Sequence, residues 1–498
     1  MVSLSRTAFI EKLSKKKDFL IFKKFKNIGI DPIYNFINIV NKRNYSFVYE
    51  SVEGGINRGR YSICGYDPLV ILKINNKKAS LHKKINSKFK KIKIKNEDPL
   101  ENLNILIKDL KIKIPKNLPP MSSAMFGYLG YEAINYVEKI SINKKIKNLK
   151  VPDCLLFYPR TLMIYDNHKN DLYIIKAFIS GTHTVKQKLY NEVIKEINDD
   201  LNLFLVPNNN IDINLNKKIH IKAKSNITKN KFFNNVEKAK KFIRDGDIFQ
   251  IVPSHRFEMD FKLPAAELYR VLRETNPSPF MYLFNFPTFN IVGSSPEILV
   301  RVRDKKVTIR PVAGTRPRGR NKKEDINNEK ELLRDAKEIS EHMMLLDLGR
   351  NDVGRVVKPG TVKVTSSFTI ERYSHVMHIV SNVEGVLKKN KTLIDALMSG
   401  FPAGTVTGAP KIRAMQIIDQ LESTKRGPYA GAVGYFSSMN EMDTCIVLRT
   451  GIIQNEKLYV QAGGGVVYDS KAEYEYKETV NKSMAIIKAA EIALGNNK

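Results

Sequence analysis

The segment QAGGGVVYDSKAEYEYKETVNK (461–482) predicts a strand, a glycine-rich loop and a helix in direct succession. A strand-like run at 457–462 leads into three consecutive glycines, which let backbone N–H groups approach a ligand without intervening side chains. The helix expected at 471–494 carries Glu475 and Glu478 on one face, because they are three residues apart. The loop does not match a nucleotide-binding fingerprint.

A second expected helix, at about 329–348, repeats this acidic spacing with Glu338 and Glu341. Four carboxylates from two helices could gather around Mg²⁺, a hard cation that takes oxygen ligands. The alternative is that both pairs are solvated surface glutamates, which is the commoner outcome for this spacing. Neither helix alone decides between the two.

One loop and one arginine indicate anion binding. FPAGTVTGAPK (401–411) ends at a helix start, where backbone amides and the helix dipole favour an anion, although ordinary turn chemistry also explains it. Arg449 falls in an apolar run that predicts a strand at 445–453, and its burial is costly unless the guanidinium meets an anion. A structural ion pair and a substrate carboxylate both satisfy that need. The place of Arg449 one strand before the glycine loop favours the substrate.

His375 and His378 lie three residues apart in ERYSHVMHIVSNVEG (371–385). Such histidines are more often satisfied polar groups than catalysts, and no nearby cysteine or third histidine supports zinc. A proton-transfer role for one of them stays open. Together with the glycine loops, the arginine and the carboxylates, they describe a site for a small polyanion held against Mg²⁺.

Helical and strand-like segments alternate irregularly along the chain, which favours an α+β fold with large antiparallel sheets over a wound parallel sheet. Strand-like alternation appears at about 45–75 and again at 155–165 and 171–178. The stretch 206–230, rich in Asn and Lys, is the clearest boundary. After it, Thr228 is a plausible N-cap for a helix that stops at Gly246.

Composition excludes several classes of protein. The 498 residues carry a net charge of +32, but lysine is spread diffusely among Ile and Asn, which favours a solvated basic surface over nucleic-acid binding. The three cysteines are far apart and give no disulfide framework, in keeping with a reducing cytoplasm. Neither a secretory signal nor a spanning apolar run is recognisable.

The motifs taken together resemble the chorismate-utilising enzymes, and among them the anthranilate synthase component I family. The resemblance covers about residues 228–490 and is weaker in the N-terminal half, where YESVEGG (49–55), GRYS (59–62) and FGYLGYE (126–132) carry it. The motifs of the C-terminal half appear in family order: DGDIFQIVPS, GSSPEILVR, RPVAGTRPRG, EHMMLLDLGRNDVGR, SHVMHIVS, FPAGTVTGAPKIRAMQIID, GAVGYFS and QAGGGVVYDS with EYKETVNK.

This resemblance implies a large antiparallel β-sandwich surrounded by helices. Residues 1–205 would form an N-terminal regulatory region packed on a chorismate-binding catalytic domain at 228–490, with 206–227 as a linker-like segment. The implied activity is the conversion of chorismate and ammonia to anthranilate and pyruvate, the first step of tryptophan biosynthesis. Aminodeoxychorismate, isochorismate and salicylate synthases are the alternatives within the family, and a basic nucleic-acid binder is the alternative outside it.

The resemblance also assigns roles to individual residues. Glu297 would protonate the departing ring hydroxyl, and His378 would assist the later loss of pyruvate. Mg²⁺ would be held by Glu341 and Glu478, with Glu338 and Glu475 binding directly or through water. The residues implied to hold chorismate are Gly314, Thr315, Thr405, Tyr429, Arg449, Gly463, Gly464 and Gly465. Arg316 and Arg318 are expected to brace their loop or to face neighbouring acids.

Two positions indicate which nucleophile attacks the ring. Relatives that make aminodeoxychorismate carry a lysine where Ala313 stands, and relatives that add water carry a lysine where Gln250 stands. Ala313 offers no nucleophile, whereas the neutral Gln250 can hydrogen-bond ammonia and aim it. Both positions therefore predict addition of free ammonia.

The resemblance further implies a partner and an inhibitor. No glutaminase-like Cys/His/Glu set is recognisable, so ammonia would come from a glutamine amidotransferase subunit, component II, in a heterotetramer of two large and two small subunits. Tryptophan would inhibit by binding next to five residues of the family's regulatory segments: Glu50, Ser51, Pro279, Phe280 and Met281. The chain departs from the family in one respect, since Val-Tyr precedes Glu50 where the family usually has two leucines.

Overall fold

The computed structural model describes residues 2–53, 57–110, 112–140, 149–180, 182, 188–206, 213–373 and 376–497. Its α-helices are α1 (Arg6–Ser14), α2 (Pro32–Asn41), α3 (Pro99–Asp109), α4 (Leu189–Leu205), α5 (Lys229–Arg244), α6 (Ala265–Thr275), α7 (Lys322–Leu332), α8 (Ala336–Gly354), α9 (Leu393–Gly400), α10 (Lys411–Leu421) and α11 (Ala472–Asn496). Short 3₁₀-helices are η1 (Pro120–Ser122), η2 (Tyr131–Tyr136) and η3 (Gly404–Val406).

The strands of the N-terminal half are β1 (Phe19–Phe25), β2 (Ser46–Glu53), β3 (Asn57–Asn75), β4 (Lys78–Ile85), β5 (Lys88–Ile92), β6 (Ala124–Leu129), β7 (Cys154–Asp166) and β8 (Asp171–Phe178). Those that follow are β9 (Lys224–Ser225), β10 (Gln250–Ile251), β11 (Ser254–Asp260), β12 (Phe280–Phe286), β13 (Phe289–Ser295), β14 (Ile298–Arg303), β15 (Lys306–Ile309), β16 (Val312–Pro317), β17 (Lys363–Arg372), β18 (Val376–Val386), β19 (Gly408–Ala409), β20 (Ala432–Ser437), β21 (Met442–Ile446), β22 (Thr450–Gln454) and β23 (Lys457–Gly463).

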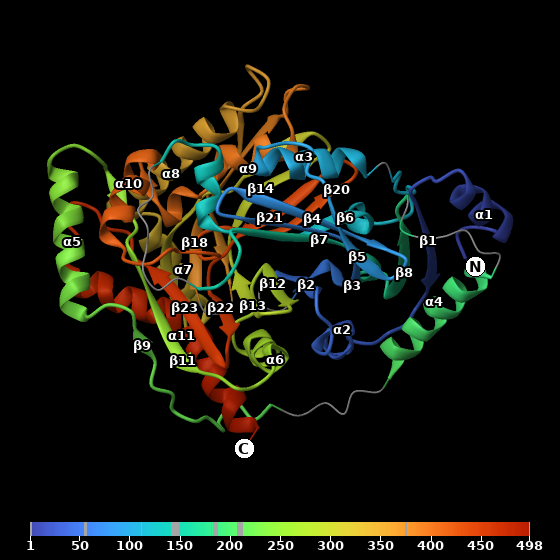
Figure 1. The fold of residues 1–498 in the computed structure, drawn as a ribbon. Coiled ribbons are helices and arrows are strands. Elements are labelled where there is room, and N and C mark those ends of the chain that lie inside the picture. The colour runs from blue at the N-terminus through green and yellow to red at the C-terminus, as the bar shows by residue number, and fades with distance from the viewer. Residues whose placement is uncertain are drawn as a thin grey trace.

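Antiparallel pairing joins 21 of these strands into one continuous sheet, with helices arranged around it (Figure 1). Strands β2 and β6 are separated along the sheet by β3 and β7. Nevertheless Phe47 in β2 stacks on Phe126 in β6, with 4.3 Å between the ring centroids, so the sheet folds over on itself. A buried core of aromatic and aliphatic side chains fills the space between the two layers. The predicted α+β class is confirmed.

The N-terminal and C-terminal parts of the sequence share this sheet. Strand β2 pairs with β12, and β6 pairs with β20, so both junctions are continuous ladders of backbone hydrogen bonds. The predicted boundary at 206–227 therefore divides the sequence but not the sheet. The regulatory role expected for residues 1–205 stays a prediction.

Two predicted elements are interrupted in the structure. The helix expected at 329–348 is two helices, because Asp335 caps α8 by accepting hydrogen bonds from the backbone N–H groups of Lys337 and Glu338. The strand expected at 445–453 is broken between β21 and β22, where Arg449 has a left-handed φ of 46° that a continuous strand cannot contain. Apolar patterning alone does not reveal either break.

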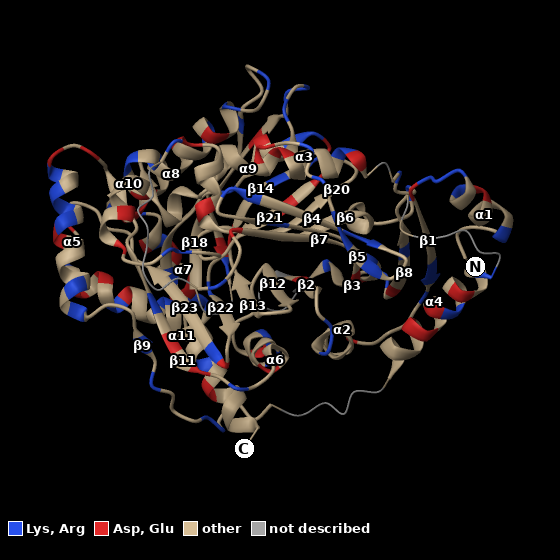
Figure 2. Ribbon diagram, in the orientation of Figure 1, with Lys and Arg blue, Asp and Glu red and all other residues tan. Residues whose placement is uncertain are grey.

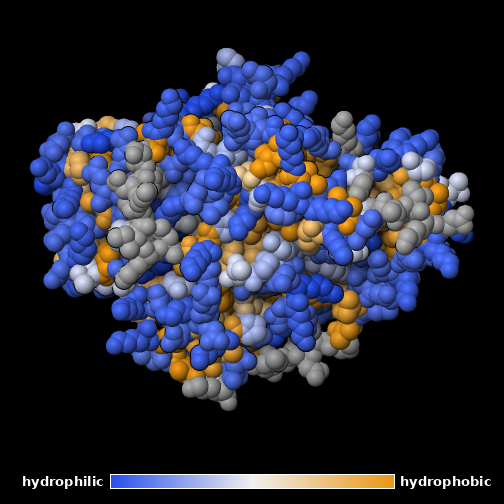
Figure 3. All heavy atoms as spheres, viewed as in Figure 1, coloured by the Kyte–Doolittle hydropathy of each residue, from blue (hydrophilic) through white to orange (hydrophobic). Residues whose placement is uncertain are grey.

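Basic residues are distributed over helices, strands and loops (Figure 2). The face of the molecule seen in Figure 3 is mostly hydrophilic, with small apolar areas between the charged side chains. In the described part of the chain, no helix is both long and apolar enough to cross a membrane.

Candidate active site

Helices α8 and α11 meet the glycine loop through a chain of contacts centred on Gln250. The Gln250 amide is buried and donates a hydrogen bond of 3.0 Å from Nε2 to Glu341 Oε1. A methyl group placed on Gly465 would lie 3.0 Å from the same Nε2, and one placed on Gly464 would lie 3.0 Å from Glu475 Oε2. Gln250 thus contacts α8 through Glu341 and the glycine loop through Gly465, and the loop contacts α11 through Glu475.

Glu475 is the most buried carboxylate of the four. Its Oε1 accepts a hydrogen bond of 2.8 Å from Ser470, whereas its buried Oε2 has no hydrogen-bond partner within the described ranges. Burial, together with the nearby charge of Glu478, raises the pKa of Glu475 to about 7. Glu478 itself forms an ion pair of 2.6 Å with Lys482.

Glu338 lies against the loop that contains Gly314. Gly314 has φ of +71°, and a methyl group there would be 3.2 Å from Glu338 Oε2, so the position requires glycine. Burial and the neighbouring Glu341 raise the pKa of Glu338, and Arg316 approaches it at 3.4 Å. Arg316 also pairs with Glu331 and Asp335.

The arginines of this loop therefore face acids rather than the interior of the site. Arg318 forms two hydrogen bonds to Asp325, of 2.8 and 3.0 Å, and a third to the carbonyl of Tyr373. Arg316 and Arg318 thus brace the loop, in agreement with the expectation from the sequence.

The four glutamates suit a hard cation in their donor chemistry. In addition to burial, Glu341 raises the pKa of Glu338 and Glu478 raises that of Glu475, and the buried Glu475 Oε2 has no hydrogen-bond partner among the described residues, so a cation would offset the repulsion and bind this oxygen. Within the described ranges, no three Asp, Glu, His or Cys side chains already converge on one point. Glu338 and Glu478 instead contact Arg316 and Lys482, at 3.4 and 2.6 Å.

Glu297 is a buried carboxyl that follows β13. Thr405 in η3 donates a hydrogen bond of 3.1 Å to its Oε1. Burial raises the pKa of Glu297 to about 8, although Thr405, Lys482 and Arg449 act in the opposite direction. At neutral pH this side chain is mostly protonated and can act as a general acid.

His378 is held by the Gly314 loop across the ladder between β16 and β18. Its Nδ1 lies 3.0 Å from both the Gly314 carbonyl oxygen and Thr315 Oγ1. Because a carbonyl only accepts, Nδ1 carries the proton and Nε2 keeps its lone pair. Burial lowers the pKa of His378 to about 4, so the ring is neutral and can accept a proton. The other candidate, His375, lies outside the described residues.

Arg449 occupies the break between β21 and β22. Burial lowers the pKa of its guanidinium, whereas the nearby Tyr373 and Glu297 side chains act to raise it. Among the described residues, no carboxylate forms an ion pair with it. The structural ion pair considered from the sequence is therefore not found among those residues.

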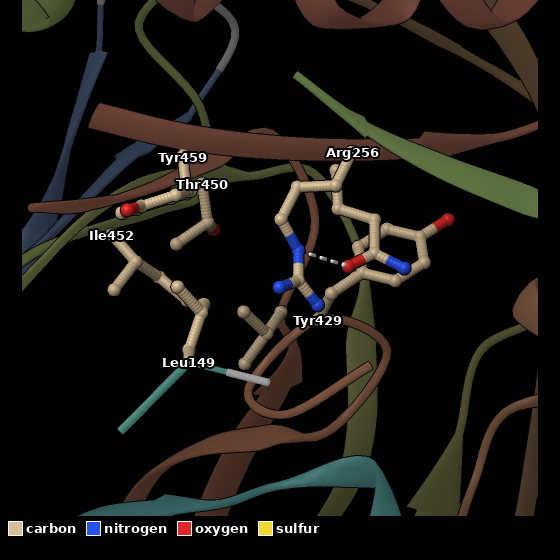
Figure 4. A pocket seen from close by; sticks show the side chains of 8 residues that line it. Leu149, Arg256, Tyr429, Thr450, Ile452 and Tyr459 are labelled. Atoms are coloured by element: carbon tan, nitrogen blue, oxygen red, sulfur yellow. Dashed lines mark hydrogen bonds between the residues drawn. The ribbon is translucent and has the colours of Figure 1, made fainter. Parts of the chain in front are cut away.

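Tyr429 and the glycine loop form the adjoining wall. A methyl group on Gly463 would lie 3.0 Å from the Tyr429 hydroxyl, so these groups are in close contact. Behind Tyr429 is a small cavity that Arg256, Leu149 and Ile452 also line (Figure 4). Tyr429 therefore has one side toward the glycine loop and the other toward the protein interior.

Lys482 belongs to this site although the sequence motifs did not single it out. Its Nζ donates a hydrogen bond of 3.2 Å to the Gly463 carbonyl, and its charge lowers the pKa values of Glu297 and His378. Its position four residues after Glu478 on the same helix, where the two side chains can pair, is the sequence feature that could have identified Lys482.

The residues expected to bind tryptophan form a second group. Glu50 and Met281 are direct partners in the ladder between β2 and β12, and the ring of Phe280 lies 6.5 Å from that of Tyr49. Glu50 is buried and binds Arg273 at 3.0 Å. Burial raises the pKa of Glu50.

The remaining two residues lie at the ends of these strands, since Pro279 directly precedes β12 and Ser51 follows Glu50 in β2. Ser51 is in close contact with Gly59 of β3, where an added methyl group would lie 2.4 Å from its Cβ. The strand pairing thus brings together two segments that are more than 200 residues apart in the sequence.

Comparison with known proteins agrees with this geometry. Residues 57–488 match the family model described as chorismate binding enzyme. The chain is 47% identical to anthranilate synthase component 1 of Cereibacter sphaeroides, over 93% of this chain and 92% of the relative, and 44% identical to that of Acetivibrio thermocellus, over 90% of each. The crystal structure of anthranilate synthase component I from Streptococcus pneumoniae superposes with a TM-score of 0.74 at 37% identity, covering 86% of this chain and 92% of that one.

A menaquinone-specific isochorismate synthase from Escherichia coli shares the fold, with a TM-score of 0.69 at 17% identity over 97% of this chain and 99% of that one. Fold, site and family model together define the class: this chain belongs to the chorismate binding enzyme family. Within that family it is a chorismate-converting enzyme of the anthranilate synthase component 1 class.

Proposed function

We propose that this chain is the large subunit that converts chorismate and ammonia to anthranilate and pyruvate. The observation that carries the proposal is that the site contains both a buried acid, Glu297, and a neutral amide, Gln250. Burial raises the pKa of Glu297 to about 8, so it holds a proton at neutral pH. Gln250, beside Glu341, has a buried Oε1 without a hydrogen-bond partner in the described part of the chain. An amide carbonyl can accept a hydrogen bond from ammonia, whereas it cannot remove a proton from water.

The substrate is a ring dicarboxylate, and the site offers matching donors. The Arg449 guanidinium, which has no ion-pair partner among the described residues, and the amides of the glycine loop suit a carboxylate. Lys482 adds a second cation next to the Gly463 carbonyl. We assign chorismate binding to Gly314, Thr315, Thr405, Tyr429, Arg449, Gly463, Gly464 and Gly465.

The reaction needs an acid and then a base. Gln250 Oε1 accepts an N–H of ammonia and directs its lone pair to ring carbon 2, while Glu297 gives its proton to the hydroxyl leaving ring carbon 4 as water. The ammonium nitrogen formed at ring carbon 2 then loses one proton to solvent and becomes the neutral amine. Neutral His378 then accepts the proton from ring carbon 2 at Nε2. The enolpyruvyl ether leaves and takes up a proton to become pyruvate, and the ring becomes aromatic.

Glu338, Glu341, Glu475 and Glu478 would hold Mg²⁺, which when bound neutralises and orients the ring carboxylate. Ammonia would come from glutamine through a component II amidotransferase, since the relatives are named as the first of two components. Tryptophan would inhibit at the group formed by Glu50, Ser51 and the Pro279–Met281 segment, where an aromatic and methionine wall suits an indole ring.

The test is product identification from the purified chain with chorismate, Mg²⁺ and ammonium. Anthranilate and pyruvate in equal amounts are expected, whereas aminodeoxychorismate or isochorismate as the main product would refute the proposal. Chelation should abolish turnover, and so should Glu341→Ala combined with Glu478→Ala, while calorimetry should show loss of Mg²⁺ binding in that variant. Glutamine should support turnover only after the amidotransferase subunit is added.

A further inference from the structure

We propose that Arg426 is a positioning residue of the active site: without touching the substrate, it sets the places of Thr405, Tyr429 and the glycine loop relative to Glu297. This inference rests on the proposed function. Arg426 lies in the turn after α10 and is among the most deeply buried side chains, with 2% of its surface exposed. A buried guanidinium is costly unless its N–H groups are satisfied by well-placed acceptors.

The guanidinium reaches three separate segments. Its Nε and Nη2 form a two-pronged contact with Glu422, at 3.0 and 2.6 Å. Its Nη1 donates 2.7 Å to the carbonyl of Val406, and Nη2 donates 2.6 Å to the carbonyl of Val252. Val406 directly follows Thr405, and Val252 is two residues after Gln250.

Val406 directly follows Thr405 in η3, the residue whose hydroxyl binds Glu297. Arg426 therefore fixes the backbone that presents this hydroxyl. If the Val406 carbonyl lost its donor, it would have to find another partner, and Thr405 would move with it.

Val252 leads to the glycine loop. The carbonyl of Pro253, the next residue, accepts a hydrogen bond of 3.3 Å from the Gly464 amide. Glu422, the partner of Arg426, also accepts bonds of 2.8 Å from both the backbone N–H and the hydroxyl of Ser254. The Arg426–Glu422 pair thus holds residues 252–254 from two sides, and through them the loop.

Tyr429 is the third element. The Arg426 guanidinium lies over its ring at 5.6 Å from the centroid, and over the ring of Tyr131 at 4.8 Å. The backbone of the turn is fixed as well, because Glu132 accepts the N–H groups of Arg426 and Gly427 at 2.9 and 3.0 Å. One buried cation therefore connects the three walls of the site.

The first variant is Arg426→Lys, which keeps the charge but cannot make the two-pronged contact and both carbonyl bonds together. Because a displacement of about 1 Å can cost ~100-fold in rate, kcat should fall at least about tenfold while KM for chorismate changes less. Arg413→Lys is the matched control, since Arg413 in α10 makes a similar two-pronged pair with Asp247 at 3.1 Å but, among the described residues, has no hydrogen bond to Thr405, Tyr429 or the glycine loop. It should keep wild-type kcat.

A second readout separates positioning from general damage to the fold. The Thr405 hydrogen bond lowers the pKa of Glu297, so withdrawal of Thr405 should raise that pKa. The basic limb of the pH–rate profile should therefore move to higher pH in Arg426→Lys but not in Arg413→Lys. A destabilised but correctly arranged site would lose rate without moving this limb.

Arg426→Met with Glu422→Gln covers the case in which the lysine variant is unstable. It removes both buried charges, and the amide oxygen introduced at position 422 can still accept from Ser254, so folding should be retained while kcat is lost. Wild-type kcat and an unmoved basic limb in either folded variant would overturn the inference. Glu297→Gln distinguishes the two proposals: if it keeps full activity, the proposed function has failed, whereas if it is inactive and Arg426→Lys is not affected, only the positioning role has failed.

Discussion

Replacing Glu297 by glutamine tests the protonation state on which the mechanism depends. The introduced amide would have the same shape and could still accept the Thr405 hydrogen bond, but it cannot ionise. An ordinary glutamate has a pKa of 4.5, and burial raises that of Glu297 to about 8. Because the folded pKa is the higher one, the folded protein holds its proton more tightly than the unfolded chain. The associated stability is complete below pH 4.5 and is lost as the pH rises through 8.

The magnitude follows from these two pKa values. Each pH unit between them corresponds to about 1.4 kcal/mol, so the whole interval corresponds to about 5 kcal/mol. Between pH 5 and pH 9, wild type should lose about 4 kcal/mol of unfolding free energy that Glu297→Gln retains. Glu297 is only 8% exposed, so solvent screens this effect little.

Urea unfolding at pH 5, 7 and 9 measures the difference, followed by the fluorescence of the 21 tyrosines because the chain has no tryptophan. The variant and wild type should have similar midpoints at pH 5 and clearly different ones at pH 9. Glu473→Gln serves as the control, since that side chain is 79% exposed and should follow wild type. Parallel pH dependence of wild type and Glu297→Gln would refute the protonated state.

The same variant should be nearly inactive. General acid catalysis by a positioned side chain contributes about 10²- to 10⁴-fold, and the amide cannot supply it. A fluorescence assay for anthranilate under saturating ammonium measures the loss. Activity close to wild type would show that the departing hydroxyl takes its proton elsewhere.

Three further substitutions test other parts of the site. In Gln250→Lys the introduced ammonium group would pair with Glu341, which lies 3.0 Å from the Gln250 amide in the wild type. Anthranilate formation should therefore fall at least about tenfold, and isochorismate should be detectable by chromatography. An unchanged product and rate would contradict the role of Gln250. Ala313→Lys buries an ammonium group at a position that is 9% exposed, so it should raise KM for chorismate or lower the unfolding midpoint. Wild-type values for both quantities would contradict this expectation. Ser51→Phe should raise the tryptophan concentration for half-inhibition at least about tenfold with kcat retained, and inhibition as strong as in wild type would remove Ser51 from that site.

Local patterns in the sequence predicted many of the helices and strands and the acidic faces of α8 and α11. The spacing of Glu475 and Glu478, and of Glu338 and Glu341, places each pair on one helix face because helical periodicity is local. Thr228 caps α5 as predicted, since capping depends only on the residues that follow it. The continuity of elements was less predictable: Asp335 divides one expected helix, and Arg449 interrupts one expected strand.

Helical faces, helix caps and the glycine-rich loop could be predicted from the order of residues alone, because these features depend on neighbours a few positions away. The protonation states of Glu297 and His378 could not be predicted in this way, since both follow from burial in the folded chain. The tertiary structure also placed Lys482 beside the glycine loop and Arg426 among three segments that are far apart in sequence. Electrostatic and positioning effects of this kind depend on distances through space, which no local pattern encodes.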